Sequence, residues 1–126
     1  MILQTVAVFL MVTFSSFFQA EAPAKVEWLE ETEYDFGEIP QHKPVRYTFT
    51  FKNISDQPIT IDNVRTSCGC TGTTWSQEPV PVDSVGSVVL EYDAALPGEF
   101  RKYARVFFNG QRKAEKLWVS GFVFVE

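Results

Sequence analysis

The sequence predicts an all-β protein, an immunoglobulin-like β-sandwich of about seven strands preceded by an N-terminal apolar export segment. Apolar and polar side chains alternate along several segments, which is the pattern of half-buried strands. Turn residues interrupt this alternation about every ten residues, and no segment after the apolar start has a helical period. Together these observations favour two packed sheets.

Composition limits the chain to one domain and excludes some functions. With 126 residues and 45% hydrophobic content, the chain can build one core but not two. The formal net charge of -5 argues against nucleic acid as a partner, because such binding depends on clustered Lys and Arg.

The start of the chain differs from the rest. Met1 to Ala20 contain no charged residue, and small residues follow at Ala20 and Ala22. We expect residues 1–22 to be a signal peptide, with an uncleaved membrane anchor as the alternative. The sandwich domain would then span 25–126, outside the cytoplasm, and only an uncleaved segment would touch a membrane.

The first strands are short and acidic, and the next is the clearest in the chain. Strand pieces are expected at 26–29 and 34–36, within a stretch that holds seven carboxylates between Glu21 and Glu38. A half-buried strand is expected at 45–53, because its apolar and polar residues alternate strictly.

The strand after 45–53 is expected to run from Ile59 toward Cys68, with a β-bulge near Asn63. It follows a turn-rich segment, so we expect it to form a hairpin with 45–53. The segment 71–81 is rich in Gly, Thr, Ser and Pro, and it is expected to be a loop.

Further strands are expected at 87–93, 100–108 and 114–125, the last two joined at Asn109-Gly110, a strong hairpin signal. This hairpin region carries six of the eleven Lys and Arg residues, which could pair with the acidic N-terminal stretch across a sheet edge. The residues expected in the core are Val45, Tyr47, Phe49, Phe51, Leu90, Tyr92, Val106, Leu117, Val119 and Val123.

Few residues could carry catalysis or bind a metal. The single histidine, His42, is expected to be solvated or structural. No hydrolase-like set of nucleophile, base and acid occurs, so neither a catalytic residue nor a cofactor is expected. Glu30, Glu31 and Glu33 lack the Gly-centred loop of a calcium site.

The run Ser67-Cys68-Gly69-Cys70-Thr71 is the one distinctive arrangement, with Cys68 and Cys70 as the candidate pair. A disulfide across so short a loop would restrict the unfolded chain little, and its strain would be typical of redox-active bridges. Two thiolates could instead bind a soft ion such as Cu(I). Inactive structural cysteines and a bond to another chain are the remaining alternatives.

The runs Tyr34-Asp35-Phe36-Gly37-Glu38-Ile39, Tyr47-Thr48-Phe49-Thr50-Phe51-Lys52-Asn53 and Ser67-Cys68-Gly69-Cys70-Thr71 follow one another in the chain. In this order they resemble the bacterial DUF1573 family, whose domains are similar to the immunoglobulin-like domains of Hydin and major sperm protein. The resemblance implies a β-sandwich exported to the periplasm or cell surface, and it implies no catalytic residue.

Two functions are therefore predicted from different classes. The first is a non-catalytic interaction module of the bacterial cell envelope, which holds another protein or an envelope component through strand edges or end loops. The alternative is a thiol-redox or copper-handling protein centred on Cys68 and Cys70.

Overall fold

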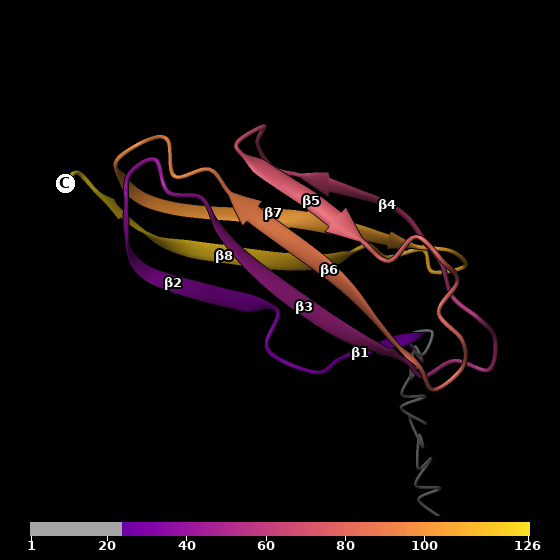
Figure 1. Ribbon diagram of the computed structural model, residues 1–126. Helices are drawn as coiled ribbons and strands as arrows, with labels where there is room; N and C mark the ends of the chain where they lie inside the picture. Colours follow the sequence, from indigo (N-terminus) through magenta and orange to yellow (C-terminus); the bar gives the residue numbers. More distant parts are fainter. Residues whose placement is uncertain (1–23) are drawn as a thin grey trace, which may run out of the picture.

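The protein is an all-β, immunoglobulin-like sandwich of two four-stranded sheets packed face to face (Figure 1). The computed structural model describes residues 24–126. The signal peptide expected at 1–22 lies outside the described residues. No helix within 24–126 is long and apolar enough to cross a bilayer.

Eight strands follow one another in the described part of the chain. The first sheet has the order β1-β3-β6-β5, and the second sheet has the order β2-β8-β7-β4. Most neighbours are antiparallel, but β2 runs parallel to β8. The strands are β1 (Val26–Trp28), β2 (Glu33–Pro40), β3 (Val45–Asn53), β4 (Ile61–Thr66), β5 (Thr71–Trp75), β6 (Val85–Tyr92), β7 (Gly98–Phe108) and β8 (Glu115–Phe124).

The core lies between the sheets and is filled by the alternate residues that face inward. Phe49 and Phe51 of β3 are fully buried, as the alternation predicts. Of the ten residues expected in the core, Val45 and Tyr47 are only half-buried, because β1 pairs with β3 only from Phe51 to Asn53 and leaves the start of β3 at the edge of its sheet. The other eight are buried, which confirms that face as the inner one.

The hairpin expected between 45–53 and the following strand is wrong. Strand β3 pairs with β1 and β6, whereas β4 crosses to the second sheet and pairs with β7. The bulge near Asn63 is confirmed by a register shift between Ile61 and Asn63. The hairpin at Asn109-Gly110 is also confirmed, since β7 and β8 pair over nine residue pairs.

The loop expected at 71–81 is wrong in its first half. Thr71–Trp75 forms β5, which pairs with β6 along its whole length and makes the eighth strand. Its threonines are β-branched and fit a half-buried strand. Because polar side chains lie on both faces of β5, the sequence lacks the alternation of apolar and polar residues that predicts a strand there.

A β-bulge in β2 shapes the surface described below. The pairing of β2 with β8 shifts between Asp35 and Glu38, and the Asp35 carboxylate accepts a 2.8 Å hydrogen bond from the Gly37 N–H. Gly37 has a φ of +71°, which favours glycine. A Cβ on Gly121 of β8 would lie 2.8 Å from the Gly37 carbonyl oxygen, so the two backbones approach closely there.

Candidate functional site

The predicted cysteine pair lies in the loop that joins β4 of the second sheet to β5 of the first sheet. Both are edge strands, so the loop connects the two sheets along one side of the sandwich. The sulfur atoms of Cys68 and Cys70 are at disulfide-bonding distance, and their Cα atoms are 5.4 Å apart. The bond closes within the loop and links no distant segments.

Hydrogen bonds hold this loop to both sheets. The Ser67 N–H donates to the Tyr103 carbonyl at 2.9 Å, and the Ser67 hydroxyl accepts from the Tyr103 N–H at 3.1 Å. On the other side, the Asp93 N–H donates to the Cys70 carbonyl at 3.1 Å. The loop thus continues the ladders of β4 with β7 and of β5 with β6.

The residues around the pair differ in burial. Cys70 packs against a small core cluster that includes Tyr92, and burial, followed by the Asp93 carboxylate, raises the pKa of Tyr92. Thr71 is buried, and its hydroxyl has no hydrogen-bond partner among the described residues. Gly69 is exposed, and nothing lies within 4 Å of a Cβ placed there. Neither packing nor backbone conformation therefore requires glycine at this position.

The other acidic and imidazole groups considered from the sequence do not converge on the cysteines. His42 is exposed in the turn between β2 and β3. The Glu30 carboxylate accepts hydrogen bonds from the Thr50 N–H and hydroxyl at 2.6 and 2.7 Å. Within residues 24–126, no group of three or more His, Cys, Asp and Glu residues could hold a metal ion.

A second candidate site, which sequence reasoning missed, is the outward face of the second sheet. We call it the charged face and define it by eight ionisable residues that point away from the core. Its cations are Arg65, Arg101, Arg105 and Lys116, and its carboxylates are Glu33, Asp35, Glu38 and Glu99.

Three of these cations stand side by side on neighbouring strands. Lys116 of β8 is the direct partner of Arg105 of β7, and Arg105 is the direct partner of Arg65 of β4. All three are exposed, and none forms an ion pair with a described carboxylate. Like charges at directly opposite positions of a sheet repel one another, so this row costs stability.

Aromatic rings on the same face support the cations. The Arg65 guanidinium lies 5.8 Å from the centre of the Phe107 ring, and the Lys116 ammonium lies 5.1 Å from that of Tyr103. The Arg101 guanidinium lies closest to a ring, at 3.8 Å from the centre of Trp118. Contacts between cations and ring faces hold these long side chains along the sheet.

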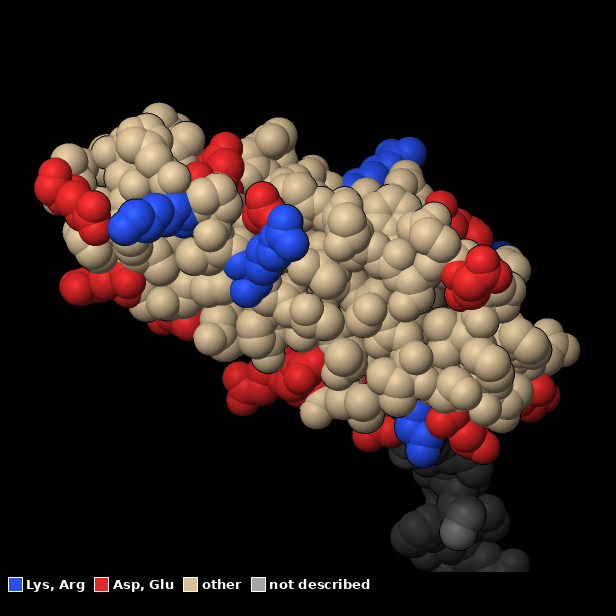
Figure 2. Space-filling view, viewed as in Figure 1, with Lys and Arg blue, Asp and Glu red and all other residues tan. Residues whose placement is uncertain are grey.

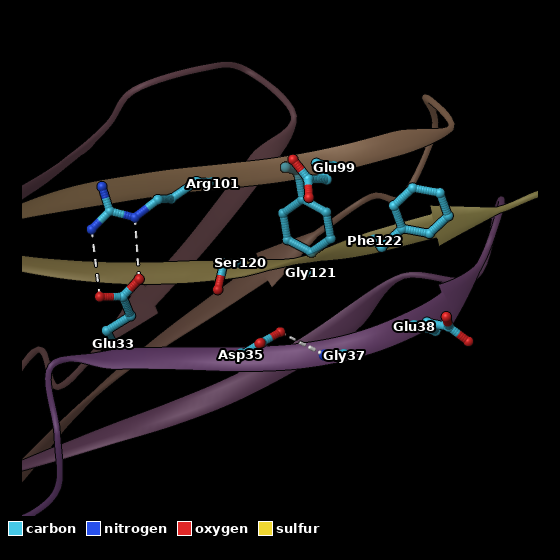
Figure 3. Close-up of a pocket in the computed structure, with 10 residues that line it drawn as sticks. Glu33, Asp35, Gly37, Glu38, Glu99, Arg101, Ser120, Gly121 and Phe122 are labelled. Carbon is cyan, nitrogen blue, oxygen red and sulfur yellow. Dashed lines mark hydrogen bonds and ion pairs between the residues drawn. The ribbon is translucent and has the colours of Figure 1, made fainter.

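Arg101 and Glu33 form the one ion pair of the charged face within residues 24–126. Two hydrogen bonds of 3.1 and 3.4 Å join the Arg101 guanidinium to the Glu33 carboxylate, across β8 (Figure 3). This pairing confirms the expected contact between the basic hairpin and the acidic N-terminal stretch, although only for one of the six cations. It lies between the cation row and the remaining carboxylates.

The charged face is hollowed at this ion pair and in the acidic part next to it. A surface hollow of about 640 Å³ is lined by Asp35, Glu38 and Glu99, together with the backbone near Gly37 and Gly121 (Figure 3). The backbone at the β2 bulge forms part of its wall. Phe122 lines the same hollow and is 44% exposed.

The outward face of the first sheet has a different character. Its strands β3 and β6 present Thr48, Thr50 and Ser87 between charged residues, and Arg46 pairs directly with Glu91 across them. Figure 2, seen from the side of β3, β5 and β6, shows charged side chains that are isolated or in small groups among uncharged atoms. On this face, the described ion pair is therefore formed between directly opposite residues of neighbouring strands.

Asn53-Ile54-Ser55 matches an N-glycosylation acceptor in sequence, but the structure places its asparagine in the core. Asn53 is fully buried, and its side-chain amide donates to the carbonyls of Gln57 and Val80 at 2.8 and 3.0 Å. The motif therefore stabilises the turn after β3 and is not accessible for modification.

Solved structures with this fold come from proteins of unrelated kinds. A protein of unknown function from Porphyromonas gingivalis W83 has a TM-score of 0.64 and 11% identity, over 77% of this chain and 46% of that chain. A PapD-like domain of human CEP192 has a TM-score of 0.65 and 8% identity, over 86% and 92%. The Vibrio cholerae VesB protease has a TM-score of 0.61 and 12% identity, over 79% and 31%.

These likenesses concern the fold alone, because all identities are low. The chain spans less than half of the Porphyromonas protein that it matches. No curated protein matches it in sequence. The family model for proteins of unknown function named DUF1573 matches residues 27–123, nearly the whole described domain, and the chain therefore belongs to this family.

Proposed function

We propose that this protein is a non-catalytic interaction module of the bacterial cell envelope, and that it binds its partner through the charged face. The observation that carries the proposal is the row of Arg65, Arg105 and Lys116 without ion-pair partners among the described residues. Each of these side chains repels its neighbour in the row, and an anionic group of a partner relieves that repulsion.

The aromatic rings beneath the cations make the row better suited to binding. A cation that rests on a ring loses less side-chain freedom when a partner arrives, so more of the contact energy contributes to affinity. An arginine guanidinium in this position still has free N–H groups at its edge, which bind carboxylates through two parallel hydrogen bonds. Arg65 near Phe107 and Arg105 near Tyr103 are placed for such contacts.

The location in the envelope is part of the same proposal. It rests on the uncharged apolar segment 1–20 and on the small residues that follow it. Intact-mass analysis of protein from cell fractions tests it, since a cleaved signal predicts a mature chain that starts between Glu21 and Lys25.

The experiment for the binding function is affinity capture from envelope extract with matched variants. A variant with Arg65, Arg105 and Lys116 all changed to Ser should lose the partners that the wild type retains. A variant with Arg46 and Lys52 changed to Ser, on the first sheet, should retain them. Equal capture by the three proteins would contradict a role for the charged face.

The alternative, thiol exchange or Cu(I) handling by Cys68 and Cys70, rests on the position of the pair in a surface loop beside the exposed Ser67 and Gly69. Titration of thiols with and without reductant, together with copper analysis of the purified protein, tests it. This alternative needs rapid reduction of the bond or bound copper at one ion per chain.

A further inference from the structure

We infer that the partner which occupies the charged face is a second copy of this chain, bound face to face. This inference rests on the proposed function and names its partner. The observation behind it is that the charged face has a basic end and an acidic end, which we call its two poles. The basic pole consists of Arg65, Arg105 and Lys116, and the acidic pole consists of Asp35, Glu38 and Glu99.

The two poles are too far apart to neutralise each other within one molecule. Along β8 the basic pole lies at the level of Lys116, whereas Asp35 lies opposite Ser120, and Glu38 and Glu99 both lie opposite Phe122. Six residues of a strand span about 20 Å, which is about twice the distance over which salt screens exposed charges. Among the described residues of this face, only Arg101 and Glu33, between the poles, form an ion pair.

This pattern excludes partners with a uniform negative charge. A nucleic acid, an anionic polysaccharide or an anionic bilayer that contacts the basic pole would extend over the acidic pole and be repelled there. The face needs a partner whose surface carries both signs, in the opposite order and about 20 Å apart. The charged face of a second copy has this pattern.

A two-fold axis that lies between the two faces and across the strands places each strand against the same strand of the second copy, and on β7 it brings opposite poles together. If the axis runs across the strands at the level between Trp118 and Ser120, the strand register places Arg105 opposite Glu99 of the second copy. The same rotation places Arg101 opposite Tyr103 of the second copy, so a second contact between a cation and a ring is made. Each contact occurs twice, as two-fold symmetry requires.

The size of the face predicts a reversible dimer. Four strands about 4.8 Å apart and roughly eight residues long cover about 500 Å². A stable interface usually buries about 800 Å² on each partner, so association through this face is weak and depends on its charges. Increasing the salt from low to about 0.5 M should therefore weaken it at least about tenfold.

Sedimentation equilibrium of the full protein and two charge-reversal variants tests the inference. The first variant, Arg105→Glu with Lys116→Glu, has an acidic face at both poles. The second, Glu38→Lys with Glu99→Lys, has a basic face at both poles. Each variant alone should associate at least about tenfold more weakly than the wild type, because like poles then meet.

An equimolar mixture of the two variants should form a heterodimer, because the acidic face then meets the basic face. This rescue cannot arise from a folding defect, and a far-UV spectrum of each variant checks that both are folded. A variant with Arg46→Glu and Lys52→Glu on the first sheet should dimerise as the wild type does.

A wild type that stays monomeric at about millimolar concentration in low salt would overturn the inference, as would a mixture without heterodimer. If the protein is monomeric but envelope capture still depends on Arg65, Arg105 and Lys116, the binding function stands and the partner is another molecule. If neither association nor capture depends on these residues, both the inference and the proposed function fail.

Discussion

The outward faces of the two sheets carry their charged residues in different arrangements. Both cover one core, and in β3 and β7 the buried residues lie on one side of the strand. On the first sheet Arg46 lies opposite Glu91, so the charges pair across neighbouring strands. On the second sheet Arg105 lies between two other cations.

This difference in charge arrangement suits the two faces to different roles. Paired charges among threonines suit a face that only has to be soluble, and such surface pairs contribute little to stability. A row of like charges reduces the stability of the free protein and is favourable only when a partner covers it. The comparison therefore predicts opposite responses of the two faces to mutation and to salt.

The largest expected effect is on the free energy of unfolding, through the core that the two sheets share. Phe49 is fully buried in the main core cluster, and Phe49→Ala should lower the free energy of unfolding by about 3 to 5 kcal/mol. Chemical denaturation monitored by circular dichroism measures this. A loss under about 1 kcal/mol would mean that the faces do not rest on a common core.

A smaller effect is expected at the loop that joins the two sheets. Replacing Cys68 and Cys70 with Ser should lower the free energy of unfolding by less than about 2 kcal/mol, because the bond closes a very short loop. Both faces should keep their properties. Unfolding of the double variant at room temperature would instead show that the loop holds the sheets together.

The smallest effects distinguish the two faces most sharply. Arg105→Gln should raise the free energy of unfolding by about 0.5 kcal/mol at low salt, since repulsion from Lys116 and Arg65 is removed. Arg46→Gln should lower it by up to about 1 kcal/mol, since the pair with Glu91 is lost. Both changes should shrink at high salt. The same sign for both variants would contradict the contrast between the faces.

Local sequence predicted the individual strands but not their partners. The alternation over 45–53 gave the bounds and inner face of β3, because period-two burial is a local property. The crossing from β3 to β4 was missed, since turn chemistry at Ser55 and Pro58 does not determine which sheet receives the next strand. Strand β5 was missed because its threonines, such as Thr73 and Thr74, alternate between faces without alternating in polarity.

The candidate sites differ in the same way. The cysteine loop was found from sequence, because its residues are consecutive and cysteines are rare in this chain. The charged face was missed, because Arg65, Arg105 and Lys116 come from three separate strands and meet only through the register of the sheet. The sequence does contain one sign of it, the concentration of cations in the last hairpin.

The most direct test of the binding face is photo-crosslinking in living cells. A photoreactive amino acid is placed at Ser120, in the middle of the charged face, or at Thr48, in the middle of the first sheet's outward face. We expect a crosslinked product from position 120 and none from position 48. Crosslinks from position 48 alone, or equally from both, would contradict the claim that the second sheet carries the binding face.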